Sequence, residues 1–450
     1  MGDARGETVL VLGAGFSRAI AEAMPLTDEL GNLALKRAGF DERDWWATGW
    51  TFESWLSRLA EDQPDLDEAE NLLNRSRFAS LLASIGEVIC ERQDAAFETS
   101  APDWLGRLVA VLHAERCTAI SFNYDTLVEA AVMAHLLTDW RSDQRAKDVD
   151  VIGHLPPHPP STWGAKVVDS FQLVKLHGSV DWWWSPGDAT AATINRWPMR
   201  AGFGIPGCED SEERRRRLPG RSRFIIPPTA TKSAYYTNPF TRELWRRAAE
   251  ALGRARDVYL VGYSLPETDL VVAGMFRHWV TDARITVVNP CCAPIEGRLL
   301  RLAYEPHQVA RIESPRCLED LVEMLELQAS RRVLEQLHGL SDLSAPVCVA
   351  FSESVGAVAT ELRRSGSVLK VVLEARPQRP SPFGMRDESA ASPVVAHELV
   401  EALSGVEALE AELPDGSLCR IIDTAEMRQA IGHSNVWRVL VPACLPPRQE

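Results

Sequence analysis

The chain has 450 residues, of which 45% are hydrophobic and 25% are charged, so it is long enough for two or three domains, each with its own core. Its net charge of −15 argues against an obligate nucleic-acid binder, and no apolar run of roughly eighteen residues is present that would predict a membrane span. The nine cysteines include no CxxC pair, which argues against a zinc ribbon and favours a reduced, cytoplasmic protein without a metal.

The first elements in chain order are a strand, a glycine turn and a long helical region. Residues 9–12 are apolar and lead through Gly-Ala-Gly into a helix that we expect to begin near Ser17. From about 28 to 113 the pattern is helical, with apolar residues at i, i+3, i+4 and i+7 in "TFESWLSRLAE". The sequence therefore predicts a large helical insertion after the first strand and helix.

Strands and helices alternate again from residue 117 onward. The expected strands lie at 117–122, in "FQLVKLHGS" (171–179), at 223–226, at 258–265 and at 285–289. Amphipathic helices are expected around 242–255 and 269–280. This alternation predicts an α/β fold, with a Rossmann-like parallel sheet covered by helices on both faces.

A polar linker, "SDLSAP", divides the chain near residue 341. We expect one domain over residues 1–340 and a smaller C-terminal α/β domain over 345–450. Its strands are expected in "VCVAF", "SVLKVVLEA", "LCRIID" and "VWRVLVPA". Helical segments are expected between the first two of these strands, around 394–403 and near 424–431.

The predicted strands of the first domain end in unusually polar sequence. These ends read "GAGFS", "SFNYD", "KLHGS", "GYSLPETD" and "VVNP". In open α/β sheets, ligands bind in the crevice at the carboxyl ends of the strands. Five polar ends at one edge of a sheet therefore predict a binding site.

Each candidate residue also has a purely structural interpretation. Gly13, Gly15 and Ser17 form either an anion-binding helix start or a tight turn. Asn123 and Asp125 either face one ligand or cap the following helix. His177 is either a base or a buried structural histidine.

Taken in order, the motifs "GAGFS", "SFNYDTL", "KLHGS", "IIPPT", "VGYSLPETD" and "VVNP" resemble the sirtuin-like fold, specifically the NADases of bacterial anti-phage defence. The resemblance covers residues 7–300. It implies that Asn123 orients the attacking group at the nicotinamide ribose, that Asp125 faces the nicotinamide amide and that His177 is catalytic. It further implies that the NAD phosphates are bound by Gly13, Ala14, Gly15 and Ser17. It also implies that the ribose and adenine groups are contacted by Gly262, Ser264 and Asn289. Asp269 would either line the site or cap the helix that begins at Leu270.

Two departures from the protein-deacylating sirtuins favour NAD hydrolysis. The four-cysteine zinc ribbon after His-Gly is missing, and "RAIAEAMPLTDEL" replaces the Pro-Asp-Phe-Arg run after the first motif. We expect an NAD+ glycohydrolase (NADase) that cleaves the nicotinamide–ribose bond and depletes cellular NAD+ as an abortive-infection effector, with NAD+ as substrate and no metal. The resemblance also implies a homo-oligomer and a trigger such as a partner ATPase, an Argonaute-type protein or a phage component. The C-terminal domain would then serve sensing, assembly or partner docking.

Other functions stay open at this point. The main alternative is a non-catalytic module that senses a nucleotide or an ADP-ribose derivative. A zinc-free protein deacylase is a second alternative. An NAD(P)-dependent oxidoreductase is a third, against which Arg18 stands at the place of the third fingerprint glycine. The arginine run at 212–217 is interpreted as a solvated charged loop, so direct nucleic-acid binding is not expected.

Overall fold

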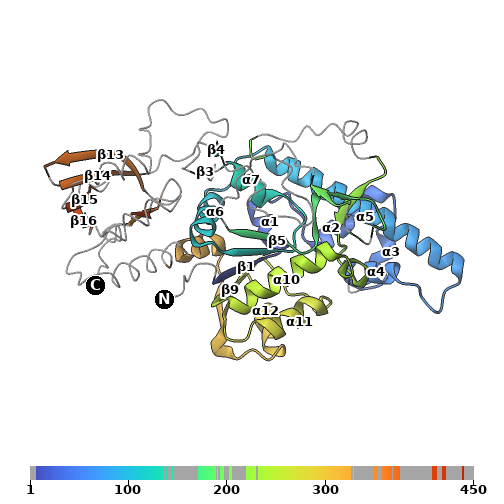
Figure 1. Ribbon diagram of the computed structural model, residues 1–450. Helices are drawn as coiled ribbons and strands as arrows, with labels where there is room; N and C mark the ends of the chain where they lie inside the picture. The colour runs from blue at the N-terminus through green and yellow to red at the C-terminus, as the bar shows by residue number, and fades with distance from the viewer. Residues whose placement is uncertain are drawn as a thin grey trace. The chain divides into compact units, whose positions relative to one another are not determined.

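The computed structural model divides the chain into two compact units, which are described separately (Figure 1). The first comprises residues 1–102, 116–131 and 148–318, and the second comprises 103–115, 132–147 and 319–450. The structure describes residues 7–134, 171–188, 193–196, 202–204, 219–229 and 232–325. It also describes the short segments 138–139, 144–145, 349–351, 357–366, 368–375, 408–412, 418–421 and 438–439, and the single residues 190 and 328.

A six-stranded parallel sheet forms the centre of the first unit. Its strands, in spatial order, are β11 (Val309–Ile312), β10 (Arg284–Val288), β9 (Asp257–Val261), β1 (Thr8–Leu12), β2 (Thr118–Ser121) and β5 (Gln172–Lys175). Every neighbouring pair is parallel. β1, β2 and β9 are almost wholly buried, as strands covered on both faces must be. The predicted Rossmann-like α/β fold is therefore confirmed.

The strand order places a topological switch point between β1 and β9. From β1 the chain moves outward to β2 and then β5, and it later returns to the other side of β1 to build β9, β10 and β11. The segments that follow β1 and β9 therefore leave the sheet in opposite directions. In open α/β sheets, a crevice at the carboxyl ends of two such strands is the usual ligand site.

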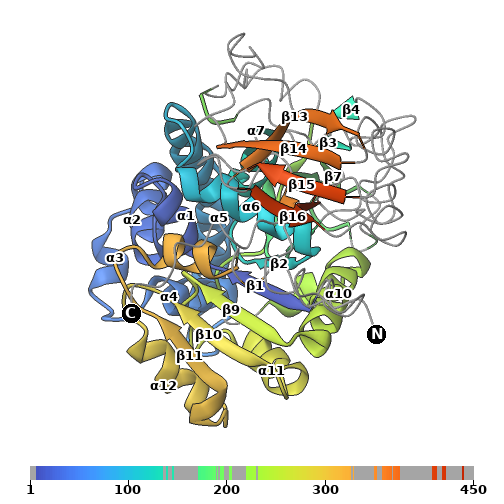
Figure 2. The same ribbon diagram turned by 90° about the vertical axis from the view of Figure 1, so that its left-hand side faces the viewer.

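Helices cover both faces of this sheet. The connection after β1 includes α1 (Ala14–Ile20), and the connections around β9 and β10 include α10 (Pro239–Arg254), α11 (Leu270–Trp279) and α12 (Ala293–Arg301). Because parallel crossovers are right-handed, connections that run in opposite directions from β1 place their helices on opposite faces. In Figures 1 and 2, α1 lies across the sheet from α10 and α11.

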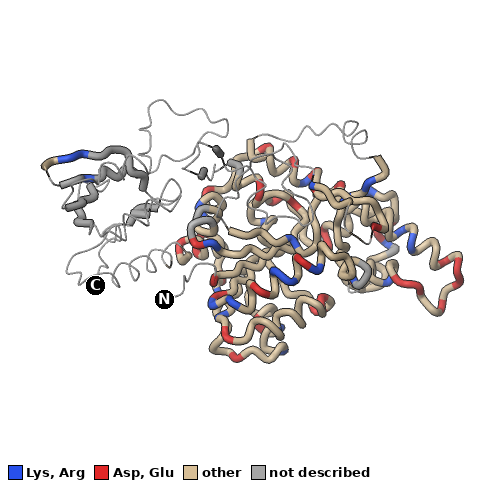
Figure 3. Tube along the Cα trace, in the orientation of Figure 1, with Lys and Arg blue, Asp and Glu red and all other residues tan. Residues whose placement is uncertain are grey.

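The helical region expected at about 28–113 is confirmed as helical. It contains α2 (Thr27–Ala38), α3 (Arg43–Trp46), α4 (Phe52–Ala60), α5 (Glu68–Phe97) and α6 (Asp103–Glu115). Thr51 caps α4, and its apolar residues Phe52, Leu56 and Leu59 are buried. The acidic stretch before and at the start of α5 is mostly exposed, and Figure 3 marks its acidic positions in red. Asp62 and Glu68 in this stretch both pair with Arg75. Within the part of the chain that the structure describes, no helix combines the length and the apolar character needed to cross a membrane.

The expectation of one strand ending in His-Gly-Ser is wrong in its detail. β5 ends at Lys175, and a second strand, β6 (Gly178–Trp184), begins after a two-residue turn. Gly178 has φ +78°, and a Cβ there would lie 2.0 Å from the carbonyl oxygen of Phe224, so this position requires glycine. β6 pairs antiparallel with β7 (Asn195–Arg196) and with β8 (Ser222–Ile225). After β8 the chain continues into α9 (Ser233–Tyr236), and α7 (Leu127–Ala134) follows β2.

The second unit contains a mixed four-stranded sheet in the order β13-β14-β15-β16. Its strands are β13 (Ala357–Ser365), β14 (Val368–Ala375), β15 (Ala408–Glu412) and β16 (Leu418–Ile421). The helix expected between the first two strands is wrong, because β13 occupies that segment and joins β14 through a hairpin with Gly366 at φ +62°. Short paired strands are β3 (Thr138–Asp139) with β4 (Gln144–Arg145), and β12 (Val349–Phe351) with β17 (Arg438–Val439). The helices expected at 394–403 and 424–431, like the arginine run at 212–217, lie outside the described residues.

Candidate functional site

Three glycines let the segments after β1 and β9 meet at the switch point. A Cβ on Gly13 would lie 2.6 Å from the carbonyl oxygen of Gly262, and one on Gly262 would lie 2.2 Å from the backbone nitrogen of Phe16. The N–H of Gly13 donates to Val261 at 3.1 Å, and that of Gly15 donates to Gly262 at 2.9 Å. The "GAG" turn therefore binds the neighbouring strand end, and these two N–H groups are already used in this arrangement.

Ser17 brings together the two motifs that follow β1 and β2. Its hydroxyl donates to Oδ2 of Asp125 at 2.6 Å and accepts from Nδ2 of Asn123 at 2.8 Å. Ser17 is only 3% exposed. The structure thus joins three of the residues expected in the site, although Ser17 is more than a hundred positions from the other two in the chain.

The orientation of the Asn123 amide follows from its partners. Nδ2 also donates to the carbonyl oxygen of Gly13 at 2.8 Å, and a carbonyl can only accept, so the nitrogen must face inward. With both amide hydrogens used, Oδ1 is the group left for other contacts, and it forms no hydrogen bond with any residue that the structure describes. Asn123 is half-buried and therefore offers an oriented acceptor at the end of β2.

Hydrogen bonds from neighbouring residues hold both the side chain and the backbone carbonyl of Asp125. Oδ1 accepts from the N–H of Leu127 at 3.2 Å, which is the helix-capping role weighed for this residue. The ammonium of Lys175 donates to the Asp125 carbonyl at 2.5 Å, to Ser179 at 2.6 Å and to Glu129 at 3.0 Å. Lys175 is 1% exposed, and its three hydrogens satisfy three acceptors from different segments.

His177 lies in the turn between β5 and β6 and is 7% exposed. Its ring contacts the edge of Phe122 with centroids 4.9 Å apart, and Phe122 immediately precedes Asn123. Nε2 is 3.3 Å from the ammonium of Lys232. Burial, and secondarily the Lys232 cation, holds the pKa of His177 well below its usual value. The imidazole is therefore neutral at physiological pH.

Lys232, Glu53 and Tyr263 complete the cluster and were missed in the sequence. Lys232 pairs with Asp269 at 2.8 Å, while Asp269 also caps α11 through the N–H of Val272. Glu53 accepts from the hydroxyl of Thr268 at 2.5 Å, and burial raises its pKa. The sequence offers one weak indication that Lys232 lies in the site: it is a charged residue that follows shortly after a strand ended by two prolines. Glu53 had none, because its segment was interpreted from the apolar face alone.

Two phenols in this region have unsatisfied hydroxyls. The buried oxygens of Tyr236 and Tyr263 have no hydrogen-bond partner among the described residues. Burial raises the pKa of Tyr263 well above its usual value, and the nearby Asp269 and Glu53 carboxylates add to this. Tyr263 also stacks on Phe122 at 4.6 Å. These phenols remain protonated and are donors available to an oxygen-rich ligand.

Two residues expected to contact NAD do not join the cluster. Ser264 is exposed, and its carbonyl accepts from Arg298. Asn289 follows β10 directly, and its Oδ1 accepts from the N–H of Cys291 at 3.0 Å. Their assignment to ribose or adenine contacts, like that of Ala14 at the first residue of α1, stays a prediction.

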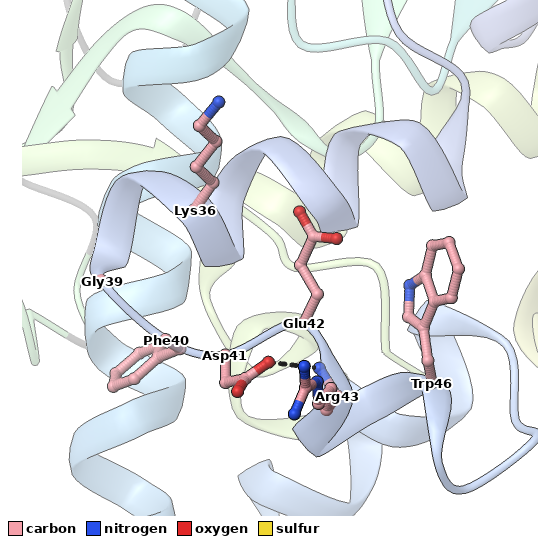
Figure 4. Close-up of a pocket in the computed structure, with 7 residues that line it drawn as sticks. All are labelled: Lys36, Gly39, Phe40, Asp41, Glu42, Arg43 and Trp46. Carbon is pink, nitrogen blue, oxygen red and sulfur yellow. Dashed lines mark hydrogen bonds between the residues drawn. The ribbon is translucent and has the colours of Figure 1, made fainter.

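A surface pocket lies elsewhere, at the end of α2 and the start of α3 (Figure 4). Its volume is about 470 Å³, and its lining residues are Lys36, Gly39, Phe40, Asp41, Glu42, Arg43 and Trp46. Asp41 accepts from the backbone N–H of Arg43 at 2.9 Å, and Trp46 is 63% exposed. Since it shares no residue with the strand-end cluster and is lined by exposed charged side chains, it is not the better candidate site.

No family model matches the chain, and no curated protein matches it at a significant level. In the described segments, no group of three or more histidine, cysteine or acidic side chains is arranged to hold a metal ion. The function must therefore be argued from the cluster at the carboxyl ends of the strands.

Proposed function

We propose that the chain is an NAD+ glycohydrolase whose site is the cluster of Ser17, Asn123, Asp125 and His177. The single observation that carries this proposal is the Ser17–Asn123–Asp125 network, with hydrogen bonds of 2.6–2.8 Å, beside the switch point of a Rossmann-like sheet. A dinucleotide is the ligand class that this part of the fold most often takes. The motif resemblance then favours cleavage of NAD+ over its use in hydride transfer.

Cleavage of the nicotinamide–ribose bond depends more on the orientation of the reacting groups than on a strong acid or base. Departure of nicotinamide leaves positive charge on the ribose ring, so the site must position an attacking water or hydroxyl and exclude competing water. The outward Oδ1 of Asn123 suits an attacking group that carries hydrogen. His177, buried and neutral, suits proton transfer or hydrogen bonding to a ribose hydroxyl.

The proposal predicts nicotinamide release that depends on Asn123 and His177. Replacing either by alanine should lower the rate by about 10²–10⁴-fold, because each variant loses an orienting or proton-handling group. Nicotinamide formed from NAD+ by wild type and variants is measured by chromatography. His278→Ala is the matched control, since His278 is exposed on α11, and it should cleave NAD+ at the wild-type rate.

A second candidate, a non-catalytic nucleotide sensor, is favoured by two observations: Ser17 and Asn123 are hydrogen-bonded to each other, and Nε2 of His177 faces a cation. A sensor would bind NAD+ or an ADP-ribose derivative without releasing nicotinamide, and His177→Ala would not weaken that binding. Turnover that persists in both alanine variants would instead contradict the assignment of the site.

The wider role follows from the resemblance alone. An NADase that empties a cell of NAD+ would act in the cytoplasm as an abortive-infection effector against phage. We propose that it works as a homo-oligomer under the control of a trigger, for which a partner ATPase, an Argonaute-type protein or a phage component are candidates. The C-terminal domain is the part of the chain proposed to receive that trigger.

A further inference from the structure

Lys232 forms a contact with His177 that the proposed chemistry does not use. Its ammonium lies 3.3 Å from Nε2 of His177 and 2.8 Å from Oδ2 of Asp269. The same carboxylate oxygen is 3.8 Å from Nε2. All three side chains are at least nine-tenths buried, so the contact is screened little by water.

The donor and acceptor roles in this contact have one consistent assignment. An ammonium group can only donate hydrogen bonds, so Nε2 must accept and must carry no proton. The proton of the neutral imidazole is then on Nδ1. An imidazolium would instead turn an N–H toward a buried ammonium, which brings like charges together in a medium of low polarity.

The groups around His177 come from several elements, and the Lys232–Asp269 pair is the charged one nearest to Nε2. Glu53 projects from α4, and burial raises its pKa. The phenols come from the segments after β2 and β9 and from α9, and burial raises the pKa of all of them, so they stay neutral; they are Tyr124, Tyr263 and Tyr236. The protonation state of His177 is thus governed by its burial and by the ammonium of Lys232.

We propose that Lys232, anchored by Asp269, is a positioning residue that caps the Nε2 lone pair of His177 and keeps the imidazole neutral with its proton on Nδ1. This inference rests on the proposed function and sharpens the part that His177 plays in it. In this arrangement His177 presents an N–H donor at Nδ1. It accepts a proton from a water or a ribose hydroxyl at Nε2 only when Lys232 withdraws.

The test is an NMR titration of the full chain with ¹⁵N-labelled histidine side chains. The chain has ten histidines, and a spectrum of His177→Gln identifies the signals of His177. In the wild type, Nε2 should resonate as an unprotonated nitrogen, and His177 should not titrate between about pH 8 and pH 6. In Lys232→Met the cation is lost while Asp269 stays close, so the pKa of His177 should rise by at least about one unit.

Two variants separate this effect from a general loosening of the fold. Lys175→Met removes another ion-paired ammonium that is 1% exposed, but Lys175 does not contact His177, so His177 should stay neutral. Asp269→Asn retains an oxygen that can cap α11 and removes the negative charge, so it should also leave His177 neutral. Loosening would instead change the titration in all three variants.

Two results would overturn the proposal. One is a wild-type Nε2 that carries a proton at neutral pH, which can be measured even if Lys232→Met does not fold. The other is a folded Lys232→Met protein in which the signals of His177 titrate as in the wild type. Nicotinamide release is recorded separately across pH. If the wild type never releases nicotinamide, the proposed function is wrong. The role of Lys232 is then still decided by the NMR titration, which does not depend on activity.

Discussion

At the scale of single residues, the candidate site is held by buried side chains that satisfy one another. Ser17 links Asp125 to Asn123, and Lys232 links Asp269 to His177. A buried polar group without a partner costs about 1–3 kcal/mol, so these pairs stabilise the fold as well as orient the site. The groups that stay available to a ligand among the described residues are Oδ1 of Asn123 and the hydroxyls of Tyr236 and Tyr263.

Glu53 should make the unfolding free energy depend on pH in a direction opposite to that of most carboxylates. Its pKa is raised in the folded protein, so the folded state binds the proton more tightly than the unfolded state. The resulting loss of stability is absent below the usual glutamate pKa and grows as pH rises through the raised one. Glu53→Gln should remove this loss and be more stable than the wild type at pH 7, with the difference shrinking toward pH 4.

Thermal unfolding of the wild type and Glu53→Gln across this pH range checks the expectation. Glu267→Gln is the control, because Glu267 has a side chain that is 70% exposed and pairs with Arg301 at the surface. It should change stability little at any pH. A Glu53→Gln protein that is less stable than the wild type at pH 7 would mean that the ionised carboxylate contributes a favourable interaction there.

The residues of the site were partly readable in the sequence. Asn123, Asp125 and His177 lie within four residues of strand ends, and parallel strands bring their carboxyl ends to one edge, so their grouping could be predicted. The partners Lys232 and Glu53 could not, because a buried ion pair or a buried carboxylate depends on tertiary packing that no local pattern encodes. The sequence also does not decide whether Asp125 caps a helix or contacts a ligand. In the structure, Oδ1 accepts from the N–H of Leu127 at the start of α7, and Oδ2 accepts from Ser17.

At the scale of elements, the close approach of the segments after β1 and β9 depends on glycine. Gly262 has φ +57°, and its Cα lies so near the start of α1 that any Cβ would meet backbone atoms, which cannot move aside as a side chain can. The close approach of the two segments therefore depends on Gly13, Gly15 and Gly262 together. Arg18, at the place of a third fingerprint glycine, is instead exposed enough to pair with Glu29.

Gly262→Ala should lower the unfolding free energy by at least about 2 kcal/mol, the combined cost of a strained backbone and steric overlap. Gly274→Ala is the matched control, since Gly274 is exposed in α11 and a Cβ there meets nothing within 4 Å. Alanine at this helical position should stabilise by about 0.5–1 kcal/mol. Urea unfolding of the two variants measures both changes, and equal effects of the same sign would contradict this account of the junction.

The two errors in predicting elements have different causes. β6 was merged with β5 because the turn at 176–177 was overlooked, although β6 begins at Gly178, a glycine with positive φ. The segment of β13 was separated from the following strand but was predicted as helical, and its antiparallel pairing with β14 shows that it is a strand. Strand pairing is a tertiary interaction that the local residue pattern does not encode.

At the scale of the whole molecule, the parallel sheet of the first unit could be predicted from the alternation of strands and helices, and the candidate site lies beside its switch point. The central claim is that NAD+ binds at this switch point. Hydrogen–deuterium exchange with and without NAD+ tests it most directly. We predict slower exchange in the segments 12–20, 121–127 and 261–270, and unchanged exchange at residues 36–46, which line the surface pocket. Slower exchange at 36–46 or in the second unit, with the three strand-end segments unchanged, would contradict the account.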